Sequence, residues 1–448
     1  MSYGTYMLLF AVIQLAFVFA LGACVGSLLN VLVYRLPLGL DVVRPTSRCP
    51  LCATKLTWRE NVPILGWLWL RGRCRFCRGP ISAEYPLVEL FVATMFAGLY
   101  AWWYLTPAGW ALLHSARPEW AANGIVLTWP TYVVLITLLA CLVAATLIDA
   151  RTFTIPATVV NVPTAVGVVG HTLHGLWIDL RHGGLERVEI GWTWTIASPG
   201  PDGWNWLGVA IGGVLGLIAS WALVKAGVLR RSFEDYEAWE TEAIERARAE
   251  RVASGEGGGS DEDEPQDPSA LWVQYPHARR EMMRELLYIG PAIALALCGV
   301  WLGVWLGSPW ALDAQSGSMM PGSAMPLWLQ AASGSVLGYL IGGGVVWLMR
   351  IAGSLMFGKE AMGLGDVHLM AAVGACLGAI DPTVAFFVAA FVGVMVEAVR
   401  ALFAGGIKQT LPYGPHLAVA TVLVLVFKPW VEWGLGAMLR YGEPFPLP

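Results

Sequence analysis

Residues 7–33 read MLLFAVIQLAFVFALGACVGSLLNVLV and contain no charged side chain. About 20 apolar residues are enough to cross the hydrocarbon core of a bilayer as a helix. No lysine or arginine precedes Arg35, and the run is longer than the apolar core of a cleaved secretory signal. The sequence therefore predicts a retained transmembrane helix at the start of the chain.

Similar apolar runs recur along the whole chain. Its 448 residues are 56% hydrophobic and 13% charged, whereas soluble domains carry about 25% charged residues. We predict an all-α polytopic membrane protein with about 8–10 transmembrane helices and a small zinc-knuckle domain. The runs lie at 7–33, 86–106, 129–148, 157–178, 207–229, 286–307, 333–357, 367–380, 383–404 and 413–431.

The basic residues indicate how these helices are oriented. Alternating the loops between the two sides places 23 of the 28 lysines and arginines on one side. Cytoplasmic loops are enriched in these residues. The distribution therefore predicts extracytoplasmic termini and a cytoplasmic segment 34–85, and it places Asp149 and Asp366 at the cytoplasmic ends of their helices.

The chain divides into five predicted parts. The first helix (1–33) is followed by a cytoplasmic domain (34–85) and by helices that include Asp149 (86–230). A charged, partly disordered cytoplasmic insertion (231–285) precedes the helices that include Asp366 (286–448). Inside the insertion, SGEGGGSDEDEPQDPS (254–269) has too few apolar residues to order itself.

Four cysteines in segment 34–85 form the pattern C-x2-C-x21-C-x2-C, with ligand candidates Cys49, Cys52, Cys74 and Cys77. Two such pairs suit a closed, four-thiolate structural zinc site, whereas a catalytic zinc keeps an open position. A small polar segment gains folding free energy from a metal. The alternative is a pair of disulfides or redox thiols, which a reducing cytoplasm disfavours.

Two aspartates interrupt apolar runs at Asp149 (TLLACLVAATLID) and Asp366 (MGLGDVHLMAAVGA). Ionisable residues in or beside membrane spans indicate functional sites. Two carboxyls at one depth can share a proton, so that one activates water as a base and the other protonates the substrate carbonyl. Taken singly, each could also be a helix-end charge, and Asp366 a helix N-cap. We assign mainly structural roles to Asp313, His368, Asp381 and Glu397.

Seven segments occur in an order that resembles the type IV prepilin peptidases, also called prepilin leader peptidase/N-methyltransferases. Four lie near the start of the chain, and three include or follow the aspartates. They are GSLLNVLVYRLP (26–37), SRCPLC (47–52), NVPILGWLWLRGRCRFC (61–77), ISAEYPLVEL (81–90), IDARTFTIP (148–156), MGLGDVHLM (362–370) and LPYGPHLA (411–418).

The resemblance implies a multi-pass aspartic endopeptidase of the bacterial cytoplasmic (inner) membrane, with Asp149 and Asp366 as its catalytic pair. Its implied substrates are type IV prepilins or type II secretion pseudopilins, whose basic leader is removed at the cytoplasmic face. A second implied activity methylates the new N-terminal residue with S-adenosyl-L-methionine. Membrane lipid surrounds such a protein, and no nucleic acid partner is expected. The residues of the methyl-donor site are not identified.

The chain departs from the family pattern at three positions. His368 replaces the usual lysine, Ala157 replaces a frequent Asp or Asn, and Ala93 replaces a common glycine. The interval between the aspartates is also longer, with an apparent extra helix pair. One alternative is therefore a peptidase that has lost methylation. Another is a transporter with a zinc-stabilised loop, although transport favours mid-bilayer acidic residues and repeats.

Overall fold

The computed structural model describes most of the chain, namely residues 3–182 except 45, 108, 111, 112 and 115, residues 203–246 except 237, 240 and 244, and residues 275–312, 319–404 and 412–438. The acidic tract 254–269, Asp313 and Leu411 lie outside these residues.

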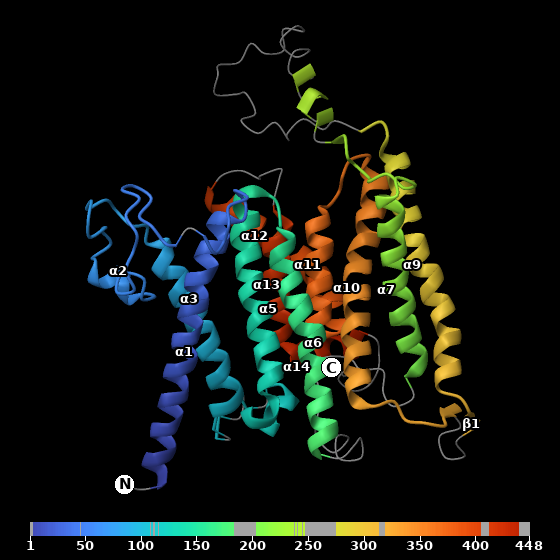
Figure 1. Cartoon of the computed structure of the whole chain (residues 1–448), viewed down its shortest axis with the longest axis horizontal. Coiled ribbons are helices and arrows are strands. Elements are labelled where there is room, and N and C mark those ends of the chain that lie inside the picture. Colours follow the sequence, from blue (N-terminus) through green and yellow to red (C-terminus); the bar gives the residue numbers. More distant parts are fainter. Residues whose placement is uncertain are drawn as a thin grey trace.

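Long helices running side by side make up most of the protein (Figure 1). Seven of the described helices are long and apolar enough to cross a membrane, or eight if a bent pair forms one span. The predicted class, a polytopic helical membrane protein, is therefore confirmed. Including shorter ones, the main described helices are α1 (Tyr3–Arg35), α3 (Glu84–Tyr100), α5 (Ile125–Thr152), α6 (Ala157–His182), α7 (Trp204–Lys225), α9 (Ala278–Leu306), α10 (Leu327–Phe357), α11 (Leu364–Leu377), α12 (Ile380–Ala404), α13 (Tyr413–Val426) and α14 (Lys428–Met438).

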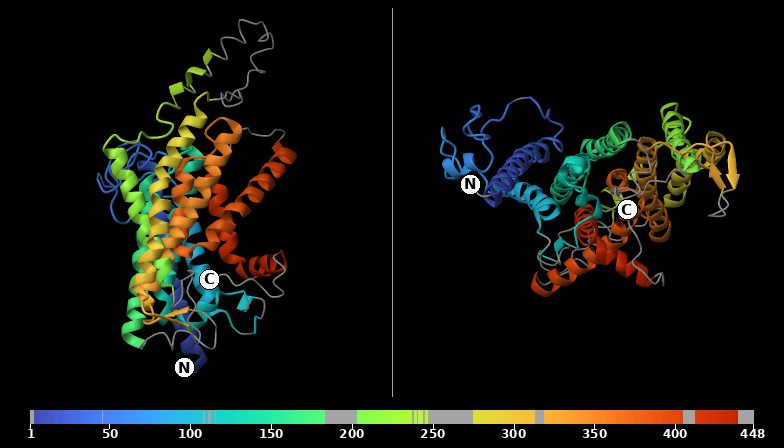
Figure 2. Two further views of the ribbon diagram at one scale, coloured as in Figure 1. Left: turned by 90° about the vertical axis from the view of Figure 1, so that its right-hand side faces the viewer. Right: turned by 90° about the horizontal axis from the view of Figure 1, so that it is seen from below.

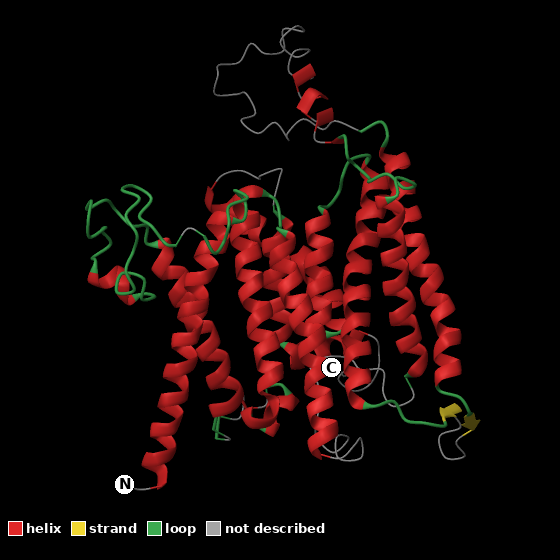
Figure 3. Cartoon of the chain, viewed as in Figure 1, coloured by secondary structure: helices red, strands yellow, loops and turns green. Residues whose placement is uncertain are grey.

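Short elements connect these helices. The four-cysteine segment contains α2 (Leu65–Trp69), and α3 continues into η1 (Ala101–Leu105) before η2 (Glu119–Asn123). Figure 3 shows how small the strand content is. The described residues contain one antiparallel pair, in which β1 (Trp310–Leu312) faces β2 (Met319–Pro321) with Trp310 opposite Pro321.

The last predicted helix is wrong as a single element. The run 413–431 is two helices, α13 and α14, bent by 89°. The break falls at Phe427, immediately before Lys428 and Pro429. Proline has no backbone N–H and clashes with the preceding turn. This local constraint prevents α13 from continuing straight, although its apolar composition continues.

The loops that contain most basic residues lie at one end of the helix bundle. In Figure 1, the four-cysteine segment lies at the upper left, the described residues 226–246 after α7 lie at the top, and the N-terminus is at the bottom. The C-terminal end of α5 and the start of α11 lie toward this same end. Asp149 and Asp366 are therefore at the same end of the bundle.

Helix α5 is at the centre of the molecule. Seen from below, α1 and α3 lie at one edge, α7 and α9 lie at the other, and α5 and α6 lie between them (Figure 2). Helices α6, α11 and α13 pack around α5, which has the most buried residues of the candidate spans. This central position fixes Asp149 inside the bundle rather than on its lipid-facing surface.

Helices α10 and α11 approach each other through facing glycines. A Cβ added to Gly374 would lie 2.0 Å from the carbonyl oxygen of Gly338, and one added to Gly338 would lie 2.0 Å from that of Gly374. Small residues of this kind allow helix backbones to pack closely in membranes. The glycine pair therefore sets the position of α11, which includes Asp366.

We predict that Gly374→Ala lowers stability, because the added methyl group has to push α11 away from α10. Overpacking of this kind costs about 1–3 kcal/mol. Thermal unfolding of the detergent-purified protein measures the effect. Gly344→Ala is the matched control, since a Cβ at Gly344 in α10 meets nothing within 4 Å. Equal melting of the two variants would contradict this account of the packing.

Candidate functional site

Asp149 lies in the last turns of α5 and is 6% exposed. The helix ends because Phe153 adopts a left-handed conformation (φ 53°), and the Phe153 N–H bonds to the Asp149 carbonyl oxygen at 2.9 Å. The Asp149 carboxylate accepts a hydrogen bond of 3.1 Å from the backbone N–H of Gly414. Gly414 is in the first turn of α13, where backbone N–H groups have no partner within the helix. The start of α13 therefore holds the Asp149 side chain in place.

Position 414 requires glycine, because the Asp149 carboxylate lies so close to its backbone. A Cβ there would lie 2.6 Å from Oδ2 of Asp149 and 3.2 Å from Cδ1 of Ile155. Ile155 also contacts the third segment, because a Cβ at Gly365 would lie 3.0 Å from the Ile155 Cβ. The side chain of Ile155 thus lies between the Gly414 and Gly365 backbones.

Asp366 completes this group of three segments. It lies in the first turn of α11, is 8% exposed, and its N–H bonds to the Gly363 carbonyl oxygen at 3.3 Å. Its carboxyl is close enough to interact electrostatically with Asp149, Arg350 and Tyr413. The structure therefore brings together the two aspartates that the sequence singled out, which are 217 positions apart in the printed sequence. Their catalytic role stays a prediction.

The other polar residues named from the sequence lie elsewhere. His368 is exposed, and its Nδ1 lies 2.7 Å from the Leu364 carbonyl oxygen. Asp381 is buried in the first turn of α12, just past the C-terminal end of α11, and its carboxylate lies 3.7 Å from Nζ of Lys428. Glu397 pairs with Arg400 at 3.3 Å. These contacts are consistent with structural roles.

Sequence reasoning assigned no role to three residues beside the aspartates. Tyr413 and Gly414 lie in a segment that was recognised only by resemblance, and Arg350 was counted only as a basic residue of a loop. Arg350 is in fact within α10 and is 1% exposed. An arginine at the end of an apolar run was the available signal, because a charge buried in a membrane protein requires a partner.

The four cysteines form a compact cluster. Their sulfur atoms all lie within 4.8 Å of one another, and Cys49 Sγ is 3.8 Å from Cys77 Sγ. A tetrahedral metal with metal–sulfur bonds of about 2.3 Å separates its sulfurs by roughly 3.8 Å. The four cysteines are unpaired as disulfides. This arrangement fits a four-thiolate metal site better than it fits two disulfides.

The two cysteine pairs have the same backbone turn. Cys49 N–H bonds to Thr54 O, and Cys74 N–H bonds to Gly79 O. The residue four positions after each of these cysteines has a left-handed conformation, at Ala53 (φ 55°) and Arg78 (φ 58°). Short bridges pair Arg48 with Lys55 and Arg73 with Pro80. The repeated turn points both cysteines of each pair toward the cluster.

Hydrogen bonds favour the thiolate forms that a metal requires. The Thr54 side chain and backbone lower the pKa of Cys52 to about 6. The backbone N–H groups of Cys77 and Phe76 lower the pKa of Cys74. Since a metal binds the thiolate rather than the thiol, these two positions are prepared for metal binding.

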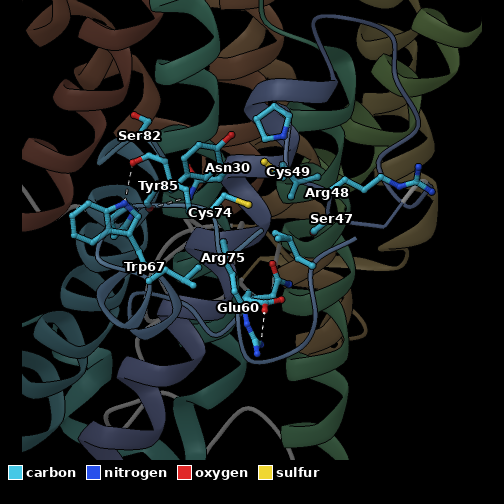
Figure 4. Close-up of a pocket in the computed structure, with 18 of the residues that line it drawn as sticks. Asn30, Ser47, Arg48, Cys49, Glu60, Trp67, Cys74, Arg75, Ser82 and Tyr85 are labelled. Carbon is cyan, nitrogen blue, oxygen red and sulfur yellow. Dashed lines mark hydrogen bonds and ion pairs between the residues drawn. The ribbon is translucent and has the colours of Figure 1, made fainter. Parts of the chain in front are cut away.

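A cavity of about 530 Å³ lies between the four-cysteine segment and the adjoining ends of α1 and α3. Figure 4 shows its walls, in which Asn30, Trp67 and Tyr85 lie near Cys49 and Cys74. The indole N–H of Trp67 donates to the Ile81 carbonyl oxygen at 3.1 Å. Ligand pockets commonly have volumes of about 300–1,000 Å³, so this cavity is large enough for a small organic molecule.

The cavity wall combines aromatic rings with charged groups. Glu60 accepts hydrogen bonds from Arg75 at 3.3 Å and from the Thr57 backbone N–H at 2.6 Å. The bonds from Thr57 hold the pKa of Glu60 below its usual value, so its carboxylate is ionised at neutral pH. Glu89 accepts a 2.6 Å hydrogen bond from the Ile64 N–H, which attaches the four-cysteine segment to α3.

Comparison with known proteins identifies the class of this N-terminal region. Residues 20–104 match the family model described as the bacterial peptidase A24 N-terminal domain. This match and the relatives described next confirm the resemblance to the prepilin leader peptidase/N-methyltransferase family. The matched residues include the second half of α1, the four cysteines and α3.

Individual relatives agree with this match. The chain is 53% identical over 96 residues to the prepilin leader peptidase/N-methyltransferase of Myxococcus xanthus, covering 20% of this chain and 29% of that protein. It is 38% identical over 131 residues to that of Aeromonas hydrophila (24% and 43%) and 44% identical over 87 residues to that of Klebsiella pneumoniae (18% and 38%). The chain thus spans less than half the length of these relatives. No solved structure matches.

We predict that Cys49→Ser/Cys74→Ser removes bound zinc, because it leaves two of the four thiolates. Metal content of the purified protein, measured by mass spectrometry, should fall from about one zinc per chain toward zero. The control is Cys298→Ser, an exposed cysteine on α9. Unchanged zinc in the double variant would rule out the four-cysteine site.

Proposed function

We propose that this chain is an aspartic endopeptidase that removes the basic leader from type IV prepilins or pseudopilins and then N-methylates the new N-terminal residue. The observation that carries the proposal is the meeting of three distant segments. The Gly414 N–H binds the Asp149 carboxylate, and Asp366 lies within electrostatic reach of both Asp149 and Tyr413.

The site suits hydrolysis by two carboxyl groups. Carboxyls that interact closely cannot both ionise easily, so the pair holds one proton. In the proposed reaction the ionised member takes a proton from water, and the water oxygen attacks the scissile carbonyl carbon. The protonated member donates its proton to the carbonyl oxygen. Cleavage then releases the leader carboxylate and a new amino terminus.

The Gly414 N–H has a specific role in this proposal. It donates to Oδ2 of Asp149, and it leaves Oδ1 available for the water or the shared proton. Gly363 and Gly365 precede Asp366, and a Cβ at Gly363 would meet only Asp366 Oδ2 at 3.8 Å and the Gly365 N at 3.9 Å. Open backbone of this kind gives an extended peptide room to approach the carboxyl.

We place this site at the cytoplasmic face of the bacterial inner membrane. Both aspartates lie at the end of the bundle where the basic loops gather, and 23 of the 28 lysines and arginines belong to the proposed cytoplasmic side. A prepilin keeps its basic leader in the cytoplasm, so its cleavage point would enter the membrane at the depth of Asp149 and Asp366. The five-part division of the chain fits this arrangement.

The cavity beside the four cysteines is our proposed site for the methyl donor, S-adenosyl-L-methionine. Its volume of about 530 Å³ suits a ligand of that size. Tyr34, Trp67 and Phe76 supply rings for a base to stack on, and Glu60 and Arg75 supply charges for the polar end. The donor contributes an activated methyl group, and these side chains would bind and orient it.

The departure at Ala93 is compatible with retained methylation. Ala93 is fully buried in α3, and a Cβ on Gly22 of α1 would lie 2.7 Å from its Cα. Ala93 therefore lies where the backbones of α1 and α3 are in close contact. The described residues that line the cavity do not include Ala93, so this alanine does not remove a contact to the proposed donor.

We expect Asp149→Asn and Asp366→Asn each to abolish cleavage, with kcat reduced at least about 1,000-fold, because an amide can neither take nor give the shared proton. The assay mixes purified protein with a prepilin that has a basic leader and a Gly-Phe junction. Asp381→Asn is the matched control, as it neutralises a buried acid at the other end of α11. Normal cleavage by either catalytic variant would refute the pair.

We expect Tyr34→Ala to raise the KM for S-adenosyl-L-methionine roughly tenfold, because an aromatic ring stacked on a base is worth about 1–3 kcal/mol. The rate of methylation, followed by the mass of the cleaved N-terminus at a series of donor concentrations, gives this KM. Tyr6→Ala is the control on the same helix, since Tyr6 and Tyr34 are both 56% exposed. An unchanged KM in Tyr34→Ala would exclude the cavity as the donor site, and no methylation by the wild-type protein would favour a peptidase alone.

A further inference from the structure

Arg350 is a buried cation at the end of α10 that faces two carboxylates. It is 1% exposed. Its Nε donates to Glu285 Oε1 at 3.0 Å, and its NH1 donates to Glu360 Oε1 at 2.6 Å. Its guanidinium carbon also lies 5.3 Å from the ring centre of Phe233, within the range of a cation–π contact. Every face of the guanidinium group is thus occupied by protein.

On one side, Arg350 holds the loop that precedes Asp366. Arg350 NH1 also donates to the carbonyl oxygen of Met362, and the Ala361 N–H donates to Ser354 Oγ at 3.1 Å. The loop 358–363 is therefore attached to α10 immediately before α11 begins. Arg350 is close enough to interact electrostatically with Asp366 itself.

The other side of Arg350 faces α9, the helix in which the inserted segment ends. Glu285 is 2% exposed, and its carboxylate accepts hydrogen bonds from Ser232 Oγ at 2.9 Å and from the Trp347 indole N–H at 2.8 Å in addition to Arg350. Glu281, one turn earlier, accepts from the Phe233 N–H at 3.1 Å and from Arg284 at 2.8 Å. Hydrogen bonds to these two carboxylates thus join the start of the inserted segment to α9, and Glu285 in turn joins α9 to Arg350 of α10.

An apolar cluster covers this charge network. Phe233 and Tyr236 belong to the start of the insertion and Tyr275 to its later part, and all three pack with Ile351 of α10. The rings of Tyr236 and Tyr275 are 5.4 Å apart. The Tyr275 N–H donates to the Gly358 carbonyl oxygen at 2.8 Å, so the insertion also binds the first residue of the loop directly.

We propose that Arg350 and Glu285 are positioning residues for Asp366, and that the two ends of the inserted segment clamp the loop 358–363. This inference rests on the proposed peptidase function. Because Arg350 and Glu285 are 1% and 2% exposed, neither can touch the substrate. Their effect reaches the reaction through the loop that fixes where α11 starts, and hence where the Asp366 carboxyl lies relative to Asp149.

The test is Glu285→Gln, which keeps the shape of the side chain and removes the charge that holds Arg350. We expect kcat for prepilin cleavage to fall roughly tenfold to 100-fold, since small misplacement of a catalytic group has effects of this size. KM should stay within about twofold, because the substrate contacts are intact. Glu285→Asp keeps the charge and should restore part of kcat. Each rate is normalised to the folded, monodisperse protein.

Two further variants keep the test decisive. Trp347→Phe removes one donor to Glu285 and keeps an aromatic ring at this position, so it decides the question if Glu285→Gln does not fold. Asp381→Asn is the control, because it neutralises another buried, paired acid at the opposite end of α11. The positioning role is overturned if folded Glu285→Gln and Trp347→Phe both keep the wild-type kcat, or if Asp381→Asn loses as much kcat as Glu285→Gln. Neither outcome overturns the proposed peptidase function. A wild-type protein that does not cleave prepilin overturns the proposed function, and this inference with it.

Discussion

The hydrogen bond from the Gly414 backbone to the Asp149 carboxylate is the contact on which the site depends. It connects the end of α5 to the start of α13 at a point where a single added carbon would lie 2.6 Å from the carboxylate oxygen. A backbone donor cannot be moved by rotation of a side chain. The position of Asp149 is consequently fixed by the packing of two helices rather than by another flexible group.

Asp366 is held in place by different contacts, on the opposite side of the site. Its helix is pressed onto α10 through Gly338 and Gly374, whose backbones are nearly in contact. The loop before it is attached through Arg350, a buried cation between two carboxylates. Breaking a buried ion pair leaves an uncompensated charge and is strongly unfavourable. Tight packing and buried charge together explain how two acidic groups can remain within electrostatic reach of each other in an apolar bundle.

The four-cysteine segment and the described ends of the inserted segment flank this bundle at one end (Figure 1). Each is attached to the helices by a buried glutamate that accepts backbone N–H groups, Glu89 for the first and Glu281 for the second. The two segments therefore use the same kind of attachment on opposite edges. In our proposal the first segment binds the methyl donor, and the second holds Asp366 in position relative to Asp149.

Apolar runs predicted nearly all of the helices, because a chain in lipid has to satisfy its backbone hydrogen bonds within each segment. Boundaries were less accurate. The run 129–148 extends over Ile125–Thr152, so Asp149 lies in the final turns of α5 rather than just beyond the helix. The broken pair α13 and α14 was predicted as one helix, since hydropathy does not register the effect of one proline on a continuous apolar stretch.

The sequence by itself determined the class of the fold, and it singled out the four clustered cysteines and the two aspartates, because each of these depends on local composition or spacing. Only the tertiary structure decided which groups surround the aspartates. Gly414, Ile155 and Arg350 reach the site from three separate segments, and the contacts of Arg350 with Glu285 and Glu360 involve two more. Contacts between distant segments follow from how the helices pack, and no local pattern records that packing.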